Sequence, residues 1–153
     1  MEKGVSNLTD DRNVDDILEN FTQFWGRLAE EFPPKDSYEI YRDKAKSAPN
    51  KDEALNFMHK SISEAKKMIP KNALEGMHGE IWLSQNARPY IMMRKELAEL
   101  YVYFRLIDEA VKEYFDILDM DAFDNLNIRG NLASLLLNEK RYEDFERLIE
   151  NYW

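Results

Sequence analysis

The chain has 153 residues, a net charge of -9 and no cysteine. A chain of this length suits one domain whose core needs no disulfide or metal staple, and the lack of cysteine excludes disulfides, thiol catalysis and thiolate metal sites. The acidic balance argues against direct binding to nucleic acid, which requires a basic surface. No uncharged apolar run approaches the roughly 18 residues of a membrane span, and no signal peptide is visible, so we expect a cytoplasmic protein.

The N-terminal part of the chain is predicted to be helical from about Asn13 onward. Residues 1–12 lack apolar periodicity and are expected to be a mobile N-terminus, and Pro33-Pro34 ends the first helix. Ser37 is expected to cap a short second helix that ends at the turn of residues 48–50. Apolar residues three and four apart define one face of the first helix: Val14, Ile17, Phe21, Phe24, Trp25, Leu28 and Phe32.

Two further helices are predicted before the most regular part of the sequence. Asn50 precedes Glu53 by three residues, which is the spacing of a capping box at the start of a third helix. Residues 72–85 are predicted as a helix that is weakened by Gly76 and Gly79, because each glycine costs about 1 kcal/mol relative to alanine. The apolar face of the third helix consists of Leu55, Met58, Ile62, Ala65 and Ile69.

Residues 88–152 contain one pattern twice, at an offset of 35 residues that places Arg94 on Arg129. A period in the range of roughly 20 to 50 residues is typical of stacked repeats, in which each unit buries its apolar face against its neighbour. Four helices are predicted here, joined by short loops that make consecutive helices antiparallel; they run near 89–105, 108–119, 125–138 and 141–152. Further equivalent pairs are Leu97 and Leu132, Ala98 and Ala133, Tyr101 and Leu136, Val102 and Leu137, and Glu109 and Asp144.

The repeated unit resembles the tetratricopeptide repeat (TPR). The first copy has a large-small pair, Leu97-Ala98, with Tyr101 on the first helix, and Asp108-Glu109-Ala110 followed by Tyr114 and Ile117 on the second. The second copy keeps Leu132-Ala133 and Leu136, and we expect Tyr101, Tyr114, Leu132 and Ile149 to be core residues. Departures from the family pattern are Arg94 and Arg129 at the place of its aromatic residue, and Arg105-Leu106 and Lys140 at the place of its turn glycine.

A finer resemblance points to the divergent TPR-like proteins that are related to the suppressor-of-tumorigenicity family and its bacterial relatives. It is carried by Arg88-Pro89-Tyr90, Leu97-Ala98-Glu99, Asp108-Glu109-Ala110, Asp124-Asn125 and Ile128-Arg129. The resemblance implies an all-α fold, an α-solenoid of TPR-like hairpins with about 7–8 helices. It also implies protein interaction without established chemistry.

We therefore predict a single helical domain over residues 1–153. Its N-terminal helices occupy residues 13–86, and two TPR-like helix pairs occupy residues 88–152. Because Asp52-Glu53-Ala54 is similar to Asp108-Glu109-Ala110, residues 35–70 are open to interpretation as an eroded repeat. The last helix leaves an apolar edge, for which the first helix, a second copy of the chain in a homodimer, or the continuation of a longer array are alternatives.

Motifs for catalysis and metal binding are incomplete. The only histidines are His59 and His78, and the single Glu-x-x-His element at His78 lacks the second element of a di-iron site. The acids of residues 119–125 do not have EF-hand spacing, so we interpret them as caps for the next helix. With no phosphate loop or nucleophile motif, we predict a protein that is not an enzyme and carries no metal or cofactor.

The first helices of successive TPR pairs line a concave groove in the family that the chain resembles. That resemblance implies that Arg94 and Arg129 either lie over the helix pair or line the groove. Lys95 and Asn131 match a carboxylate clamp, but Glu99 would repel a carboxylate, so we keep only a general groove. The expected lining consists of Met92, Lys95, Glu99, Tyr103, Asn127, Asn131, Ser134 and Asn138.

Two functions are expected from these features. The leading hypothesis is a module that binds a protein or peptide segment in the groove or on an acidic face, with a basic partner as one candidate. The alternative is an acidic inhibitor that mimics nucleic acid and occupies a basic nucleic-acid site of an enzyme. The charge pattern, with acidic ends and a mildly basic middle, is compatible with both and also with a plain soluble exterior.

Overall fold

The computed structural model describes residues 19–23, 27, 35–71 and 79–153, and the chain divides into two units, residues 1–35 and Asp36–Trp153. In the first unit residues 19–23 are helical; most of the predicted first helix and all of residues 1–12 lie outside the described residues. The second unit contains α2 (Ser37–Lys46), α3 (Lys51–Lys67), the 3-10 turn η2 (Ile81–Leu83), α4 (Arg88–Tyr103), α5 (Ile107–Met120), α6 (Ile128–Asn138) and α7 (Tyr142–Tyr152).

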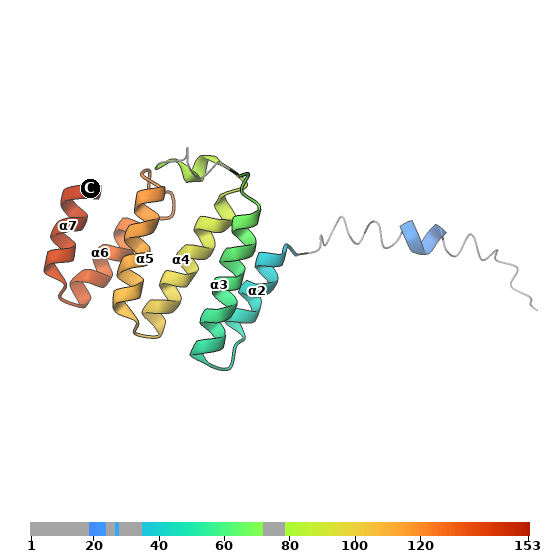
Figure 1. The fold of residues 1–153 in the computed structure, drawn as a ribbon, viewed down its shortest axis with the longest axis horizontal. Helices are drawn as coiled ribbons and strands as arrows, with labels where there is room; N and C mark the ends of the chain where they lie inside the picture. The colour runs from blue at the N-terminus through green and yellow to red at the C-terminus, as the bar shows by residue number, and fades with distance from the viewer. Residues whose placement is uncertain (1–18, 24–26, 28–34, 72–78) are drawn as a thin grey trace, which may run out of the picture. The chain divides into compact units, whose positions relative to one another are not determined.

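In the second unit, each helix from α2 to α7 packs against the next one along the chain. Figure 1 shows these helices side by side in chain order. The described ranges contain helices, turns and one isolated β-bridge, and no strand. The predicted all-α class is therefore confirmed.

The turns within the two C-terminal hairpins have the same geometry at the predicted offset. Arg105 and Lys140 adopt positive φ angles of 61° and 57° directly after α4 and α6. The next residue in each turn, Leu106 or Arg141, donates its backbone N–H to the carbonyl five residues earlier, that of Tyr101 or Leu136, at 2.8 Å in both cases. This is the Schellman ending of a helix, which glycine usually occupies. Arg105 and Lys140 therefore occupy the left-handed position of this turn, where glycine is usual.

The repeated apolar positions form the core. Ala98, Ala110, Tyr114 and Leu132 are all buried, as the pattern predicts. Ile149 was expected in the core, but this prediction is wrong, because its side chain is 40% exposed. The rotation of α7 turns the neighbouring Leu148 inward, where it is fully buried, and leaves Ile149 on the outer side of the last helix.

The helix starts confirm one predicted cap and correct another. The Asn50 side chain accepts the Glu53 backbone N–H at 2.9 Å, and its amide donates to the Glu53 carboxylate at 3.0 Å, so Asn50 caps α3 as predicted. The cap of α2 is Asp36 and not Ser37. Asp36 is favoured because Glu39, three residues on, returns its carboxylate to the Asp36 N–H at 3.1 Å, which places Ser37 in the first turn.

The predicted helix over residues 72–85 is wrong for the part that the structure describes. Gly79 has a φ of +74°, which an α-helix does not allow, and its carbonyl accepts the Ala122 N–H at 2.8 Å. Glu80 then forms the β-bridge with Asp121. A Cβ atom at Gly79 would lie 3.0 Å from Ala122 Cβ, so this backbone approach requires glycine. Gly76 and His78 lie outside the described residues.

The acids between α5 and α6 cap and close the loop, as we interpreted them. Asp121 is buried and accepts hydrogen bonds from the backbone and side chain of Asn125, at 2.7 and 2.8 Å. The Asp124 carboxylate accepts the backbone N–H groups of Ile128 and Arg129 at the start of α6. The loop thus satisfies the free N–H groups of the helix and holds its acids in local contacts.

Candidate functional site

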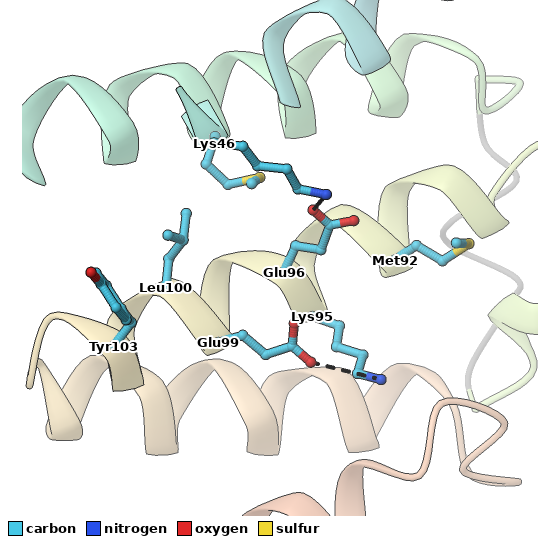
Figure 2. A pocket seen from close by; sticks show the side chains of 8 residues that line it. Lys46, Met92, Lys95, Glu96, Glu99, Leu100 and Tyr103 are labelled. Carbon is cyan, nitrogen blue, oxygen red and sulfur yellow. Dashed lines mark ion pairs between the residues drawn. The ribbon is translucent and has the colours of Figure 1, made fainter. Parts of the chain in front are cut away.

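The face formed by α4, α2 and α3 carries the first of two hollows, with a volume of about 510 Å³. Figure 2 shows Glu96 of α4 pointing toward Lys46 of α2, whereas Lys95 and Glu99 lie next to each other on the side of α4 that is turned away from Lys46. One part of the lining is apolar and the other is charged. The residues are Lys46, Met58, Met92, Lys95, Glu96, Glu99, Leu100 and Tyr103.

The charged groups of the first hollow are paired to different degrees. Glu96 lies 3.2 Å from the Lys46 ammonium and 3.9 Å from the Arg42 guanidinium. Glu99 has one cation nearby, the Lys95 ammonium at 3.8 Å, and its side chain is 52% exposed. Figure 2 draws the Lys46–Glu96 and Lys95–Glu99 pairs as dashed lines. Glu96 is therefore held within the fold, whereas Glu99 is available to a ligand.

The second hollow has a volume of about 360 Å³ and lies between α4, α5 and α6. Glu99 belongs to both hollows and is the only charged residue that lines the second one. The other lining residues carry amide, hydroxyl or apolar side chains. They are Val102, Tyr114, Asn131, Ser134, Leu135 and Asn138.

The polar side chains of the second hollow make no hydrogen bonds within the described protein. This holds for the amides of Asn131 and Asn138 and for the hydroxyls of Ser134 and Tyr114. Tyr114 is only 3% exposed, and burial, followed by the charge of Glu99, raises its pKa to about 12. The hollow thus presents hydrogen-bonding capacity that the fold itself does not use.

The residues expected in a groove are distributed over these two hollows with three exceptions. Met92, Lys95, Glu99 and Tyr103 line the first hollow, and Glu99, Asn131, Ser134 and Asn138 line the second. Asn127 lies outside both, at the start of α6, where it has a left-handed φ of 54°. Sequence reasoning missed Lys46 and Met58, because α2 and α3 could not be aligned with the repeat.

The remaining two exceptions are Arg94 and Arg129, which join the two helices of their own hairpins. Arg94 on α4 binds Glu113 and Asp116 of α5, the latter at 3.3 Å. Arg129 on α6 contacts Asp124 at 3.1 Å and donates to the Tyr152 carbonyl at the end of α7 at 2.9 Å. The two arginines are therefore equivalent in position, each joins the helices of its own hairpin, and neither lines the first or the second hollow.

Arg94 forms an ion pair that is largely buried. The Arg94 and Glu113 side chains are only 16% and 13% exposed. Burial acts to lower the pKa of Arg94, but the hydrogen bond and the charge of Glu113 outweigh it and raise the pKa above its ordinary value. Arg94 is thus a fixed cation of the hairpin interior.

Groups typical of a catalytic or metal site do not come together in either hollow among the described residues. In the described part of the chain, no hydrogen bond joins a nucleophile and a base within either hollow, and no group of three potential ligands could hold a metal ion. His59 lies outside both hollows, and its Nε2 is 3.4 Å from the Tyr101 hydroxyl. None of the helices in the described ranges has the length and apolar character needed to cross a membrane.

Comparisons of the chain with protein-family models, with curated proteins and with solved structures each find no match.

Proposed function

We propose that this chain is a non-enzymatic, TPR-like interaction module that holds a protein or peptide segment across α4 and α6. The observation that carries this proposal is the pair of hollows that share Glu99. Together they provide an apolar part, the half-exposed Glu99 carboxylate and unused hydrogen-bonding groups. Such a combination suits the alternating side chains of a polypeptide, since apolar anchors supply affinity and polar groups supply specificity.

The repeated geometry supports the TPR-like part of the proposal. Two consecutive hairpins share a turn with left-handed Arg105 or Lys140, and both bind their second helix through an equivalent arginine. In a stack of such hairpins the first helices, here α4 and α6, share one face. The hollow between them is then a consequence of the repeat.

The proposal can be tested by selecting a displayed library of random peptides on the full chain and measuring the affinity of the enriched peptides. We expect Tyr103→Ala to weaken their binding about tenfold or more, as exposed aromatic residues in binding grooves often contribute this much. Tyr103 is 77% exposed, so this change should leave thermal stability unaltered. Tyr142→Ala is the matched control, because Tyr142 is also exposed, at 60%, but lines neither hollow.

A label can locate the bound peptide independently. Because the chain has no cysteine, a single Asn138→Cys variant can carry an environment-sensitive fluorophore at the second hollow. Peptide binding should change its emission and leave the emission of a label at Ser63→Cys on α3 unchanged, since Ser63 is exposed away from both hollows. Equal responses at both labels, or no enriched peptide at all, would exclude the groove.

The alternative proposal is an acidic inhibitor that occupies a basic nucleic-acid site. It is favoured by Glu143, Glu146 and Glu150 of α7, which are exposed and form no ion pair in the described part of the chain. This function predicts binding to a basic enzyme that weakens steeply with salt and competes with DNA or RNA. Groove binding of an apolar segment predicts neither effect.

A further inference from the structure

The second hollow contains a hydroxyl group that the described protein leaves without a hydrogen-bond partner. The Tyr114 hydroxyl lines the hollow, while the residue as a whole is 97% buried and makes no hydrogen bond within the described protein. Because Tyr114 lines the hollow and its hydroxyl has no partner in the described protein, the hydroxyl is free to bind a ligand group. The amides of Asn131 and Asn138 and the Ser134 hydroxyl open into the same hollow. Their convergence indicates a ligand group that makes several hydrogen bonds.

The charge of the residues that line the second hollow indicates whether its ligand group should be cationic or anionic. Glu99 provides the only charge in the lining, and its one cation is the Lys95 ammonium, 3.8 Å away, which belongs to the first hollow alone. An anionic ligand would face the Glu99 carboxylate with no cation in the lining of this hollow to offset it. A cationic ligand would receive an opposite charge and acceptors from hydroxyl and amide oxygens.

We infer that the second hollow is a recognition site for an arginine or lysine side chain of the bound segment, and that an apolar side chain next to it occupies the first hollow. This inference rests on the proposed function and specifies its partner. A guanidinium group fits the lining best, because it offers five donors and no acceptor to a carboxylate, two amide oxygens and two hydroxyls. The shared Glu99 places the basic residue and the apolar residue close together along the partner.

The lining of the first hollow indicates why the basic residue of the bound segment should have an apolar neighbour. Met58, Met92, Leu100 and Tyr103 supply its uncharged lining, and Lys46 and Glu96 satisfy one another at its edge. Methionine side chains adapt to apolar groups of different shape. The first hollow should therefore accept several apolar residues, while the second should discriminate by charge.

The test uses the peptides selected on the full chain. The enriched sequences should share an arginine or lysine with an apolar residue within a few positions. Replacement of that arginine by citrulline, which keeps the shape but removes the charge, should weaken binding about tenfold or more. Glu99→Gln should weaken the arginine peptide similarly and should bind the citrulline peptide as well as the wild-type chain does. Glu146→Gln removes the same charge from exposed α7 and should have no effect.

A second variant probes the hydroxyl without touching the charge. Tyr114→Phe should weaken the arginine peptide about threefold or more, and it should not lower thermal stability, because the hydroxyl has no partner in the described protein. If the enriched peptides share no basic residue, or if the effects of Glu99→Gln and citrulline simply add, the inference fails while the proposed function stands. If a dimer of the chain dissociates as peptide binds, a second copy is the occupant and the inference fails. Enrichment of no peptide refutes both.

Discussion

Replacement of Arg94 separates a role inside the hairpin from a role in partner binding. The structure places its guanidinium between Glu113 and Asp116 of α5, with a further contact to the Met120 sulfur at 3.6 Å. Arg94→Leu keeps part of the apolar stem of the side chain and removes the cation. The Glu113 carboxylate, which is 13% exposed, would then be left almost buried without an opposite charge.

The size of the effect follows from the exposure of the two carboxylates. Removing one partner of a buried ion pair costs about 3–5 kcal/mol, because the other charge remains buried. Asp116 is 43% exposed, so its own pairing contributes at most about 1 kcal/mol, as for surface ion pairs. We therefore expect Arg94→Leu to lower the free energy of unfolding by about 3 kcal/mol, a large part of the stability of a domain of this size.

Urea unfolding, followed by circular dichroism, measures this change. The double variant Arg94→Leu/Glu113→Leu should recover most of the loss, because it removes both charges together. Lys67→Leu is the control: Lys67 pairs with Glu64 but is 67% exposed, so the free energy of unfolding should change by about 0.5 kcal/mol or less. If Arg94→Leu is as stable as the wild-type chain, or if the double variant is no more stable than the single one, the hairpin role is wrong.

Three further predictions concern the turns, the caps and the tyrosines. Lys140→Gly should raise the free energy of unfolding by about 0.5 kcal/mol, since glycine relieves the left-handed φ of 57° at some cost in chain entropy; a lower thermal midpoint would contradict this. Asp124→Ala should lower the free energy of unfolding by about 1–2 kcal/mol, because α6 loses its cap and Arg129 loses its carboxylate; urea unfolding measures it. Burial raises the pKa of Tyr114 and Tyr152 to about 12, with the hydrogen bond to Asp119 adding to it at Tyr152. The two tyrosines stabilise the folded state fully below pH 10, where the hydroxyl groups are protonated in both the folded and the unfolded chain, and this stabilisation is lost as the pH rises from 10 to 12. Tyr114→Phe should reduce this loss of unfolding free energy, measured by urea unfolding at a series of alkaline pH values. An unchanged dependence of the unfolding free energy on pH would refute the prediction.

The sequence predicted the repeat well because its signals are local and doubled. An offset that aligns Arg94 with Arg129 and Leu97 with Leu132 constrains helix starts, turns and buried faces together, and the described helices follow it closely. Asn50 was also predictable, since a cap acts through residues three positions away. Three expectations stay predictions: that residues 1–153 form a single domain, that the protein is cytoplasmic, and that it forms a homodimer.

The errors arose where contacts distant in sequence override local preference. Residues 79–85 are apolar enough for a helix, but the hydrogen bond from Ala122 to Gly79 and the bridge from Glu80 to Asp121 fix an extended turn. Ile149 and Leu148 are adjacent and equally apolar, and only the rotation of α7 decides which of them is buried. No periodicity in the sequence contains this information.

The two copies of the repeat agree where they build the fold and differ where they line the hollows. At the same offset that equates Arg94 with Arg129, Glu99 corresponds to Ser134 and Tyr103 to Asn138. An exact repeat would present the same chemistry twice and could hold a segment in more than one register. The substituted positions instead place apolar and charged groups along α4 and neutral hydrogen-bonding groups along α6. A segment with a basic residue beside an apolar one would therefore be held in a single direction, because its reverse would bring the apolar side chain onto the unused hydroxyls and amides of the second hollow.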